Sequence, residues 1–224
     1  MRFNMISLSR NNDIKAVFFD FGGVITQSPF ENFNQFEKEN NLPINFIRRV
    51  NSVNPDNNAW ALLEKNQIST AEFDKIFADE SEKVGHKISG RQVLELLDLK
   101  VRPEMIEIVR NCRKDFKVAC LTNNIKNQSS DCPSNIKNEY YKVLLTEFDF
   151  VVESSKIGFR KPEFDFYKYA CDLIKVAPKQ VVFLDDLGVN LKPARQLGMY
   201  TIKVEKPEKA IIDLKTVLWP TNIV

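Results

Sequence analysis

Acidic and polar side chains follow several apolar runs of this sequence, at the point where each run stops. Asp20 follows the first run and Thr122 the second, whereas Asp185 and Asp186 stand together after a later one. Lys161 lies in the stretch between Thr122 and Asp185. Carboxylates can hold Mg²⁺ through their oxygens, a lysine and a hydroxyl suit phosphate oxygens, and an aspartate can be the nucleophile of a covalent phospho-enzyme. These residue types therefore indicate metal-assisted phosphoryl chemistry.

Each of these acids has a simpler explanation when it is taken alone, because an aspartate at the end of a strand is often a turn or helix-cap residue. The adjacent pair Asp185-Asp186 is harder to explain in that way. Two neighbouring carboxylates at a buried strand end repel each other unless a cation or hydrogen-bond donors lie nearby. With Asp20, Thr122 and Lys161, the pair favours one charged site over a set of unrelated caps.

The apolar runs have the length and composition of buried strands, being short and rich in β-branched or aromatic residues. Near-continuous apolar runs fit a parallel sheet covered on both faces better than a half-exposed antiparallel sheet. The predicted strands are 14–19, 117–121, 148–152, 180–184 and 200–204.

Helical patterns alternate with these strands. Proline suits a first helical turn, so Pro103 and Pro162 are predicted to begin two helices. A third is predicted to begin at Asn190 and to end at Gly198. The alternation predicts a Rossmann-like, doubly wound α/β domain with a parallel sheet. Sheets of this kind place ligands at the carboxyl ends of their strands, where the polar residues described above would meet.

Roughly 95 residues separate the first two predicted strands, far more than one crossover helix needs. Residues 28–97 carry apolar residues at helical spacing, and Ser69 and Glu72 have the spacing of a capping box. We therefore predict a small, all-helical domain over 28–97, inserted after the first strand. The core domain would then consist of residues 1–27 and 98–224.

Charge and composition exclude several classes of protein. The chain has 32 basic and 30 acidic residues and a net charge of +2, so it has no broad basic field for nucleic acid. No apolar run reaches the roughly 18 residues that cross a bilayer, and the polar start does not resemble a signal peptide. Four cysteines without a C-x-x-C pair do not fit a disulfide framework or a zinc site, and Cys120 and Cys171 are predicted core residues. We expect a cytoplasmic monomer or homodimer that binds neither nucleic acid nor membranes.

Four segments resemble the motifs of the haloacid dehalogenase-like (HAD) hydrolases and occur in the order of that family. They are 17–24 (Val-Phe-Phe-Asp-Phe-Gly-Gly-Val), 121–124 (Leu-Thr-Asn-Asn), 154–162 and 182–190. Each motif alone is weak, but the combination is specific. The likeness is greatest to the amino-terminal phosphatase domain of soluble epoxide hydrolases and to the related domain of the acyl-CoA dehydrogenase family member 10 type, especially over 183–195. The helical domain also resembles the cap of this subgroup.

The resemblance implies a phosphatase that acts on a small phosphorylated substrate. Asp20 would attack the phosphorus and form an aspartyl phosphate. Thr122 and the amide of Asn123 would bind phosphate oxygens, and Gly23 would let the backbone approach them closely. Lys161 would neutralise charge between the nucleophile and the phosphoryl group. Sugar phosphates and lipid-like phosphates are both compatible with this pattern.

The resemblance also implies a Mg²⁺ cofactor. Asp20, Asp186 and the backbone carbonyl of Gly22 would be direct ligands. Asp185 would ligate through water or orient the site. Catalysis would then rest mainly on positioning and electrostatic stabilisation.

Gly22 departs from the family pattern, because phosphatases of this family usually carry an aspartate there as general acid. General acid–base help is worth about 10²–10⁴-fold. Three interpretations stay open. The protein could be a phosphatase whose leaving group needs little protonation, or one that borrows an acid, with Glu64 and Asp56 as candidates. It could instead be a sensor or scaffold that binds a phosphorylated ligand without turnover, or a metal-independent haloacid dehalogenase. The last leaves the pair Asp185-Asp186 without a purpose.

Overall fold

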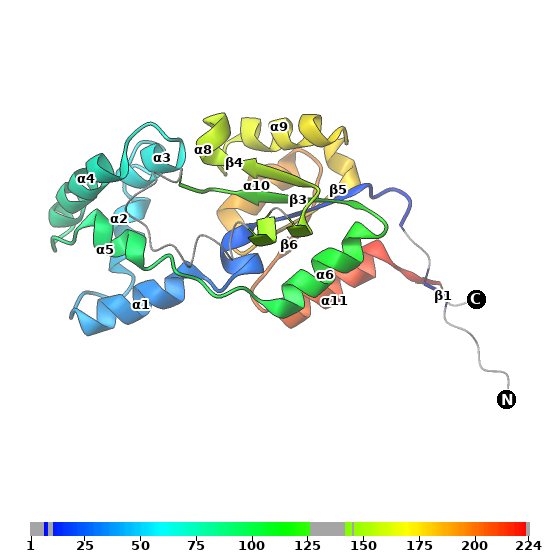
Figure 1. The fold of residues 1–224 in the computed structure, drawn as a ribbon, viewed down its shortest axis with the longest axis horizontal. Helices are drawn as coiled ribbons and strands as arrows, with labels where there is room; N and C mark the ends of the chain where they lie inside the picture. Colours follow the sequence, from blue (N-terminus) through cyan, green and yellow to red (C-terminus); the bar gives the residue numbers. More distant parts are fainter. Residues whose placement is uncertain (1–6, 9–10, 126–141, 145, 223–224) are drawn as a thin grey trace.

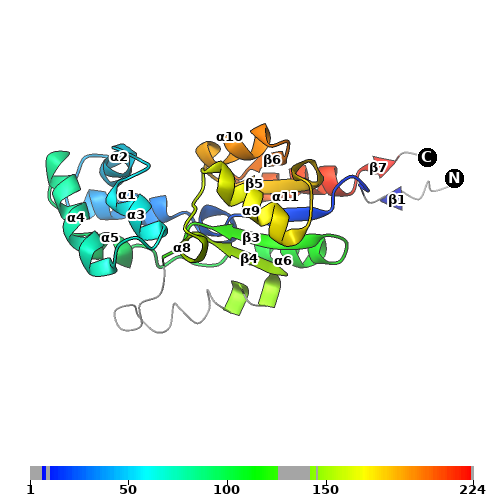
Figure 2. The same cartoon turned by 90° about the horizontal axis from the view of Figure 1, so that it is seen from above.

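The computed structural model describes residues 7–8, 11–125, 142–144 and 146–222. Within these residues, a five-stranded sheet with helices on both faces lies beside a separate group of helices (Figure 1). The short strands β1 and β7 pair at the end of the molecule that lies opposite this group (Figure 2).

The main sheet has five parallel strands in the order β4-β3-β2-β5-β6. The chain moves outward from β2 to one side and then to the other, as in the predicted doubly wound fold. The register places Phe19 of β2 opposite Cys120 of β3 and Leu184 of β5. Asp20, directly after β2, and Asp185, the last residue of β5, therefore reach the same edge. The strands are β2 Ala16–Phe19, β3 Lys117–Thr122, β4 Phe150–Glu153, β5 Val181–Asp185 and β6 Tyr200–Lys203.

Side chains of the strands alternate between two faces, and helices cover each face (Figure 1). Val17 and Phe19 pack in the cluster formed with α6 and α11, whereas Ala16 and Phe18 pack in the cluster formed with α9 and α10. All four are fully buried, which explains why the strand is apolar at every position. These helices are α6 Pro103–Arg113, α9 Phe164–Ile174, α10 Gly188–Gln196 and α11 Pro207–Leu218.

Residues 29–95, here called the helical segment, form five helices with a hydrophobic cluster of their own. Phe46, Phe73 and Phe77 are fully buried in this cluster. The predicted capping box between Ser69 and Glu72 is present and begins α4. The helices are α1 Pro29–Glu39, α2 Phe46–Ser52, α3 Ala59–Glu64, α4 Thr70–Lys83 and α5 Gly90–Glu95.

The two stretches that connect the helical segment to the sheet run side by side. Thr26 forms an isolated antiparallel bridge with Val101, and the amide of Arg102 donates to the carbonyl of Ile25 over 2.8 Å. The chain thus leaves and returns at one place. The predicted domain boundaries lie close to it, and the division into two domains stays a prediction.

Several details lie outside the sequence-based expectations. Helix α9 begins at Phe164 rather than Pro162, and α10 begins at Gly188 rather than Asn190. The amide of Leu187 donates to Oδ1 of Asp185 over 2.8 Å, so the chain already turns there before α10. The unpredicted elements are β1 Ser7–Leu8, η1 Phe21–Ile25, α8 Ser154–Ile157, η2 Pro178–Gln180, α11 and β7 Thr221–Asn222.

Cys120 and Cys171 are buried in the sheet clusters, as predicted, and Cys132 lies outside the described residues. In the described part of the chain, every helix falls short of the length and apolarity that crossing a bilayer requires.

Candidate active site

Three of the predicted acids meet at the carboxyl edge of the sheet. Asp20 follows β2, Asp185 ends β5 and Asp186 comes next. Oxygens of the three carboxylates lie within 4.8 Å of one another. This arrangement follows from the register, because the ends of β2 and β5 are neighbours.

Lys161 supplies the positive charge in this cluster. Its Nζ atom lies 2.7 Å from Oδ1 of Asp20 and 2.8 Å from Oδ2 of Asp185. The side chain is 1% exposed, so the ammonium group has exchanged water for carboxylate partners. Burial lowers the pKa of Lys161, but Asp185 and Asp20 outweigh burial and hold the pKa above its ordinary value. Lys161 therefore stays charged and links the two strand ends.

Asp185 is surrounded by donors. Besides Lys161, it accepts hydrogen bonds from the amide of Leu187 at 2.8 Å and from Nδ2 of Asn190 at 3.1 Å. Its side chain is fully buried. Three donor groups therefore hold this buried carboxylate in place.

The surroundings of Asp20 and Asp186 disfavour the charged form of both carboxylates. Burial raises the pKa of Asp20 well above its ordinary value, and repulsion from the other two acids adds to this against the pull of Lys161. Burial, and then repulsion from Asp185, raises the pKa of Asp186 to about 6. A divalent cation would relieve both carboxylates. Clustered carboxylate oxygens are the donors that Mg²⁺ prefers, so the residues present fit this ion.

The turn after Asp20 brings the backbone against the acid cluster. Gly23 has a φ of +79°, and a Cβ atom there would lie 2.3 Å from Oδ2 of Asp186. Only glycine fits this position without displacing that carboxylate. Gly22 is different, because its φ is −68° and a Cβ atom there would meet nothing within 4 Å.

Of the two predicted phosphate-binding residues of the second motif, Asn123 contacts Lys161 directly. Thr122 is the last residue of β3 and is 4% exposed. Oδ1 of Asn123 accepts from the amide of Lys161 at 2.8 Å, and its Nδ2 donates to the Lys161 carbonyl at 3.0 Å. The second motif thus fixes the backbone that carries the buried lysine.

The structure places the two candidates for the missing general acid in different surroundings. Glu64 reaches the site edge, where its Oε2 accepts from Nδ2 of Asn123 at 3.2 Å and from Nε of Arg160 at 2.6 Å. Asp56 is exposed in the loop before α3.

Two residues at the site, Asn190 and Arg160, stand outside the predicted site residues. Both fall inside the segments that resemble the family motifs, so the sequence already pointed to their neighbourhood. Their roles depend on contacts with Asp185 and Glu64 that the motifs do not specify.

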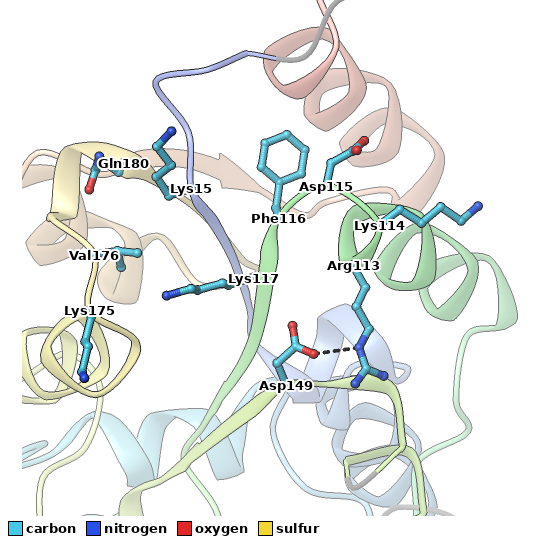
Figure 3. A pocket seen from close by; sticks show the side chains of 10 residues that line it. All are labelled: Lys15, Arg113, Lys114, Asp115, Phe116, Lys117, Asp149, Lys175, Val176 and Gln180. Carbon is cyan, nitrogen blue, oxygen red and sulfur yellow. Dashed lines mark hydrogen bonds and ion pairs between the residues drawn. The ribbon is translucent and has the colours of Figure 1, made fainter.

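A cavity of about 640 Å³ lies at the other end of the strands (Figure 3). Lys15, just before β2, and Lys117, at the start of β3, line it, and the ion pair between Arg113 and Asp149 lies at its wall. None of the predicted site residues lines this cavity. The acid cluster is therefore a separate site.

A family model described as a haloacid dehalogenase-like hydrolase matches residues 14–198. The chain belongs to the haloacid dehalogenase-like hydrolases. It is 31% identical over 216 residues to acyl-CoA dehydrogenase family member 10 from Mus musculus, covering 94% of this chain and 20% of that protein. It is 28% identical over 216 residues to bifunctional epoxide hydrolase 2 from Sus scrofa, covering 91% of this chain and 39% of that protein. The chain thus spans well under half the length of these relatives.

Solved structures of HAD-like enzymes share the fold. A HAD family enzyme from Bacteroides thetaiotaomicron, in complex with magnesium and inorganic phosphate, matches with a TM-score of 0.56 and 22% identity, covering 85% of this chain and 93% of that one. An L-2-haloacid dehalogenase from Xanthobacter autotrophicus, with chloropropionic acid covalently bound, matches with a TM-score of 0.58 and 16% identity, covering 91% and 82%. The predicted Rossmann-like HAD fold is confirmed.

Gly23→Ala should weaken Mg²⁺ binding by about 10–100-fold, because the new methyl group would displace a carboxylate of the cluster. Gly22→Ala is the matched control and should bind Mg²⁺ like the wild type, since its methyl group meets open space. Isothermal titration calorimetry with MgCl₂ measures both. Equal affinities of the two variants would show that Asp186 does not hold the ion.

Proposed function

We propose that this HAD-like hydrolase is a Mg²⁺-dependent phosphatase of small phosphate monoesters that works through an aspartyl phosphate on Asp20. The observation that carries the proposal is the buried Lys161, which bridges Asp20 and Asp185 inside a cluster of three carboxylates. The helical segment would act as a cap that closes over the site and excludes water.

Asp20, Asp186 and the carbonyl of Gly22 would hold the metal, with Asp185 orienting the site. When bound, Mg²⁺ would stabilise negative charge on the phosphoryl oxygens. The structural neighbour from Bacteroides thetaiotaomicron has magnesium and inorganic phosphate bound, which supports the choice of Mg²⁺ in this proposal.

Asp20 would supply the nucleophile through Oδ2. Its Oδ1 already accepts from the amide of Phe21 at 2.6 Å and from Nζ of Lys161, so these donors fix the carboxylate in place. Oδ2 would form a bond to phosphorus while the bond to the ester oxygen breaks. The electron pair of that bond would leave with the alcohol oxygen, which would take its proton from water.

The second step would return Asp20 to its free form. Water would attack the phosphorus of the aspartyl phosphate and lose its proton to solvent, while the bond between phosphorus and Oδ2 breaks. The electron pair of that bond would return to the carboxylate of Asp20, and inorganic phosphate would leave. Lys161, Thr122 and the amide of Asn123 would hold the phosphoryl oxygens in both steps. Preorganised charges and dipoles of this kind lower the barrier because they need no reorganisation.

No aspartate at position 22 serves as general acid, and Glu64 does not replace it in this arrangement. Both carboxylate oxygens of Glu64 are engaged as acceptors, Oε1 from Trp60 and Oε2 from Arg160 and Asn123. The enzyme would therefore favour esters whose alcohol leaves readily without protonation.

Asp20→Asn should reduce the hydrolysis of p-nitrophenyl phosphate with Mg²⁺ to background, because the amide cannot attack phosphorus. Asp165→Asn, which changes an exposed acid of α9, should keep wild-type activity. Absorbance of p-nitrophenolate measures the rate. Mg²⁺ binding without release of phosphate from a broad panel of esters would favour the sensor, and metal-free chloride release from 2-chloropropionate would favour the dehalogenase.

Rates should fall steeply as the pKa of the leaving alcohol rises, because no acid protonates the leaving oxygen. Gly22→Asp should raise rates on alkyl phosphates most, by up to about 10²-fold, since the position has room for a side chain. Gly22→Asn has the same size without the acid and is the matched control. A flat dependence on leaving-group pKa in the wild type would mean that another group already supplies the proton.

A further inference from the structure

Glu64 carries a carboxylate from the helical segment to the edge of the sheet. It ends α3, and its side chain is 9% exposed. Its Oε1 accepts from Nε1 of Trp60 at 2.9 Å, within the segment. Its Oε2 accepts from Arg160 and Asn123, both on the sheet side. One side chain therefore joins the two parts of the molecule.

The residues that contact the helical segment lie on either side of Lys161 in the sequence. Arg160 precedes it, donates to Glu64, and reaches the carbonyl of Pro55 at 3.2 Å. Glu163 follows it by two residues and forms an ion pair of 2.6 Å with Lys65. The helical segment thus holds the loop around Lys161 on both sides.

Asn123 links Glu64 to the backbone of Lys161. A carboxylate can only accept, so Glu64 requires the amide nitrogen of Asn123 to face it. The oxygen of Asn123 then faces the other way and accepts from the Lys161 amide. The Lys161 backbone sets the same orientation, because its carbonyl also accepts from Nδ2 of Asn123, so loss of the Glu64 charge would weaken one of three hydrogen bonds that hold this side chain.

We propose that Glu64 is a positioning residue, which couples docking of the helical segment to the placement of Asn123 and Lys161. Its effect on turnover rests on the proposed phosphatase activity, whereas docking does not. The role differs from general acid catalysis, because Glu64 would act through Asn123 and Arg160 and donate no proton. The site would then be complete only when α3 is docked.

The test compares Glu64→Gln with Lys65→Met, which removes the other ion pair between the segment and the loop without touching Asn123. Glu64→Gln should lower kcat for p-nitrophenyl phosphate by about 10–100-fold, as expected for misplaced groups. Lys65→Met should lower kcat less than Glu64→Gln does, because it leaves the contact between Glu64 and Asn123 intact. The double variant Glu64→Gln/Arg160→Gln should lose less than the product of the two single effects, because both substitutions disrupt the shared contact between Glu64 and Arg160.

Two further readouts separate positioning from the alternatives. Glu64→Gln should slow p-nitrophenyl and alkyl phosphates by the same factor, whereas loss of a general acid would slow alkyl phosphates more. Hydrogen exchange of the backbone amides in α3 and in residues 154–163 should rise in Glu64→Gln, and this readout needs no catalysis. Calorimetric titration with inorganic phosphate and Mg²⁺ should show weaker binding for Glu64→Gln than for Lys65→Met.

Equal kinetic effects of Glu64→Gln and Lys65→Met would overturn the positioning role, and so would selective loss on alkyl phosphates. Unchanged hydrogen exchange in Glu64→Gln would overturn the docking role. If the wild type hydrolysed no ester, the proposed function would fail, while exchange and phosphate binding would still decide the role of Glu64.

Discussion

The ammonium group of Lys161 lies between the carboxylates of Asp20 and Asp185, almost out of reach of water. Removing charges from water costs several kcal/mol per ion, and close opposite charges repay that cost only in good geometry. The sheet supplies this geometry, because its register brings the ends of β2 and β5 together. Three carboxylates against one lysine leave the cluster with excess negative charge, which a bound Mg²⁺ would offset.

The loop that carries Lys161 lies outside the strands of the sheet, so side chains from other parts of the molecule hold it in place. Asn123, after β3, bonds both backbone groups of Lys161. The helical segment adds ion pairs from Glu64 and Lys65 on either side. The position of the buried charge therefore depends on two separately packed clusters, one in the sheet and one in the helical segment.

The sequence predicted the elements whose burial leaves a pattern. The central strands β2, β3 and β5 are buried on both faces and read as apolar runs, so their ends, and with them Asp20 and Asp185, could be located. The capping box at Ser69 was visible because its two partners lie within one helical turn. Two-residue strands such as β1 carry no periodicity. The contact between Glu64 and Arg160 joins residues 96 positions apart and depends on how two packed units dock, which no local pattern encodes.

The most direct test of the central claim is to trap the covalent intermediate on Asp20. The wild type would be mixed with p-nitrophenyl phosphate and Mg²⁺, quenched rapidly in acid, and digested for mass spectrometry. The account predicts a phosphoryl group on the peptide that contains Asp20, and on no other acidic residue. Turnover with no phosphorylated peptide, or with the group on Asp185 or Asp186, would contradict it.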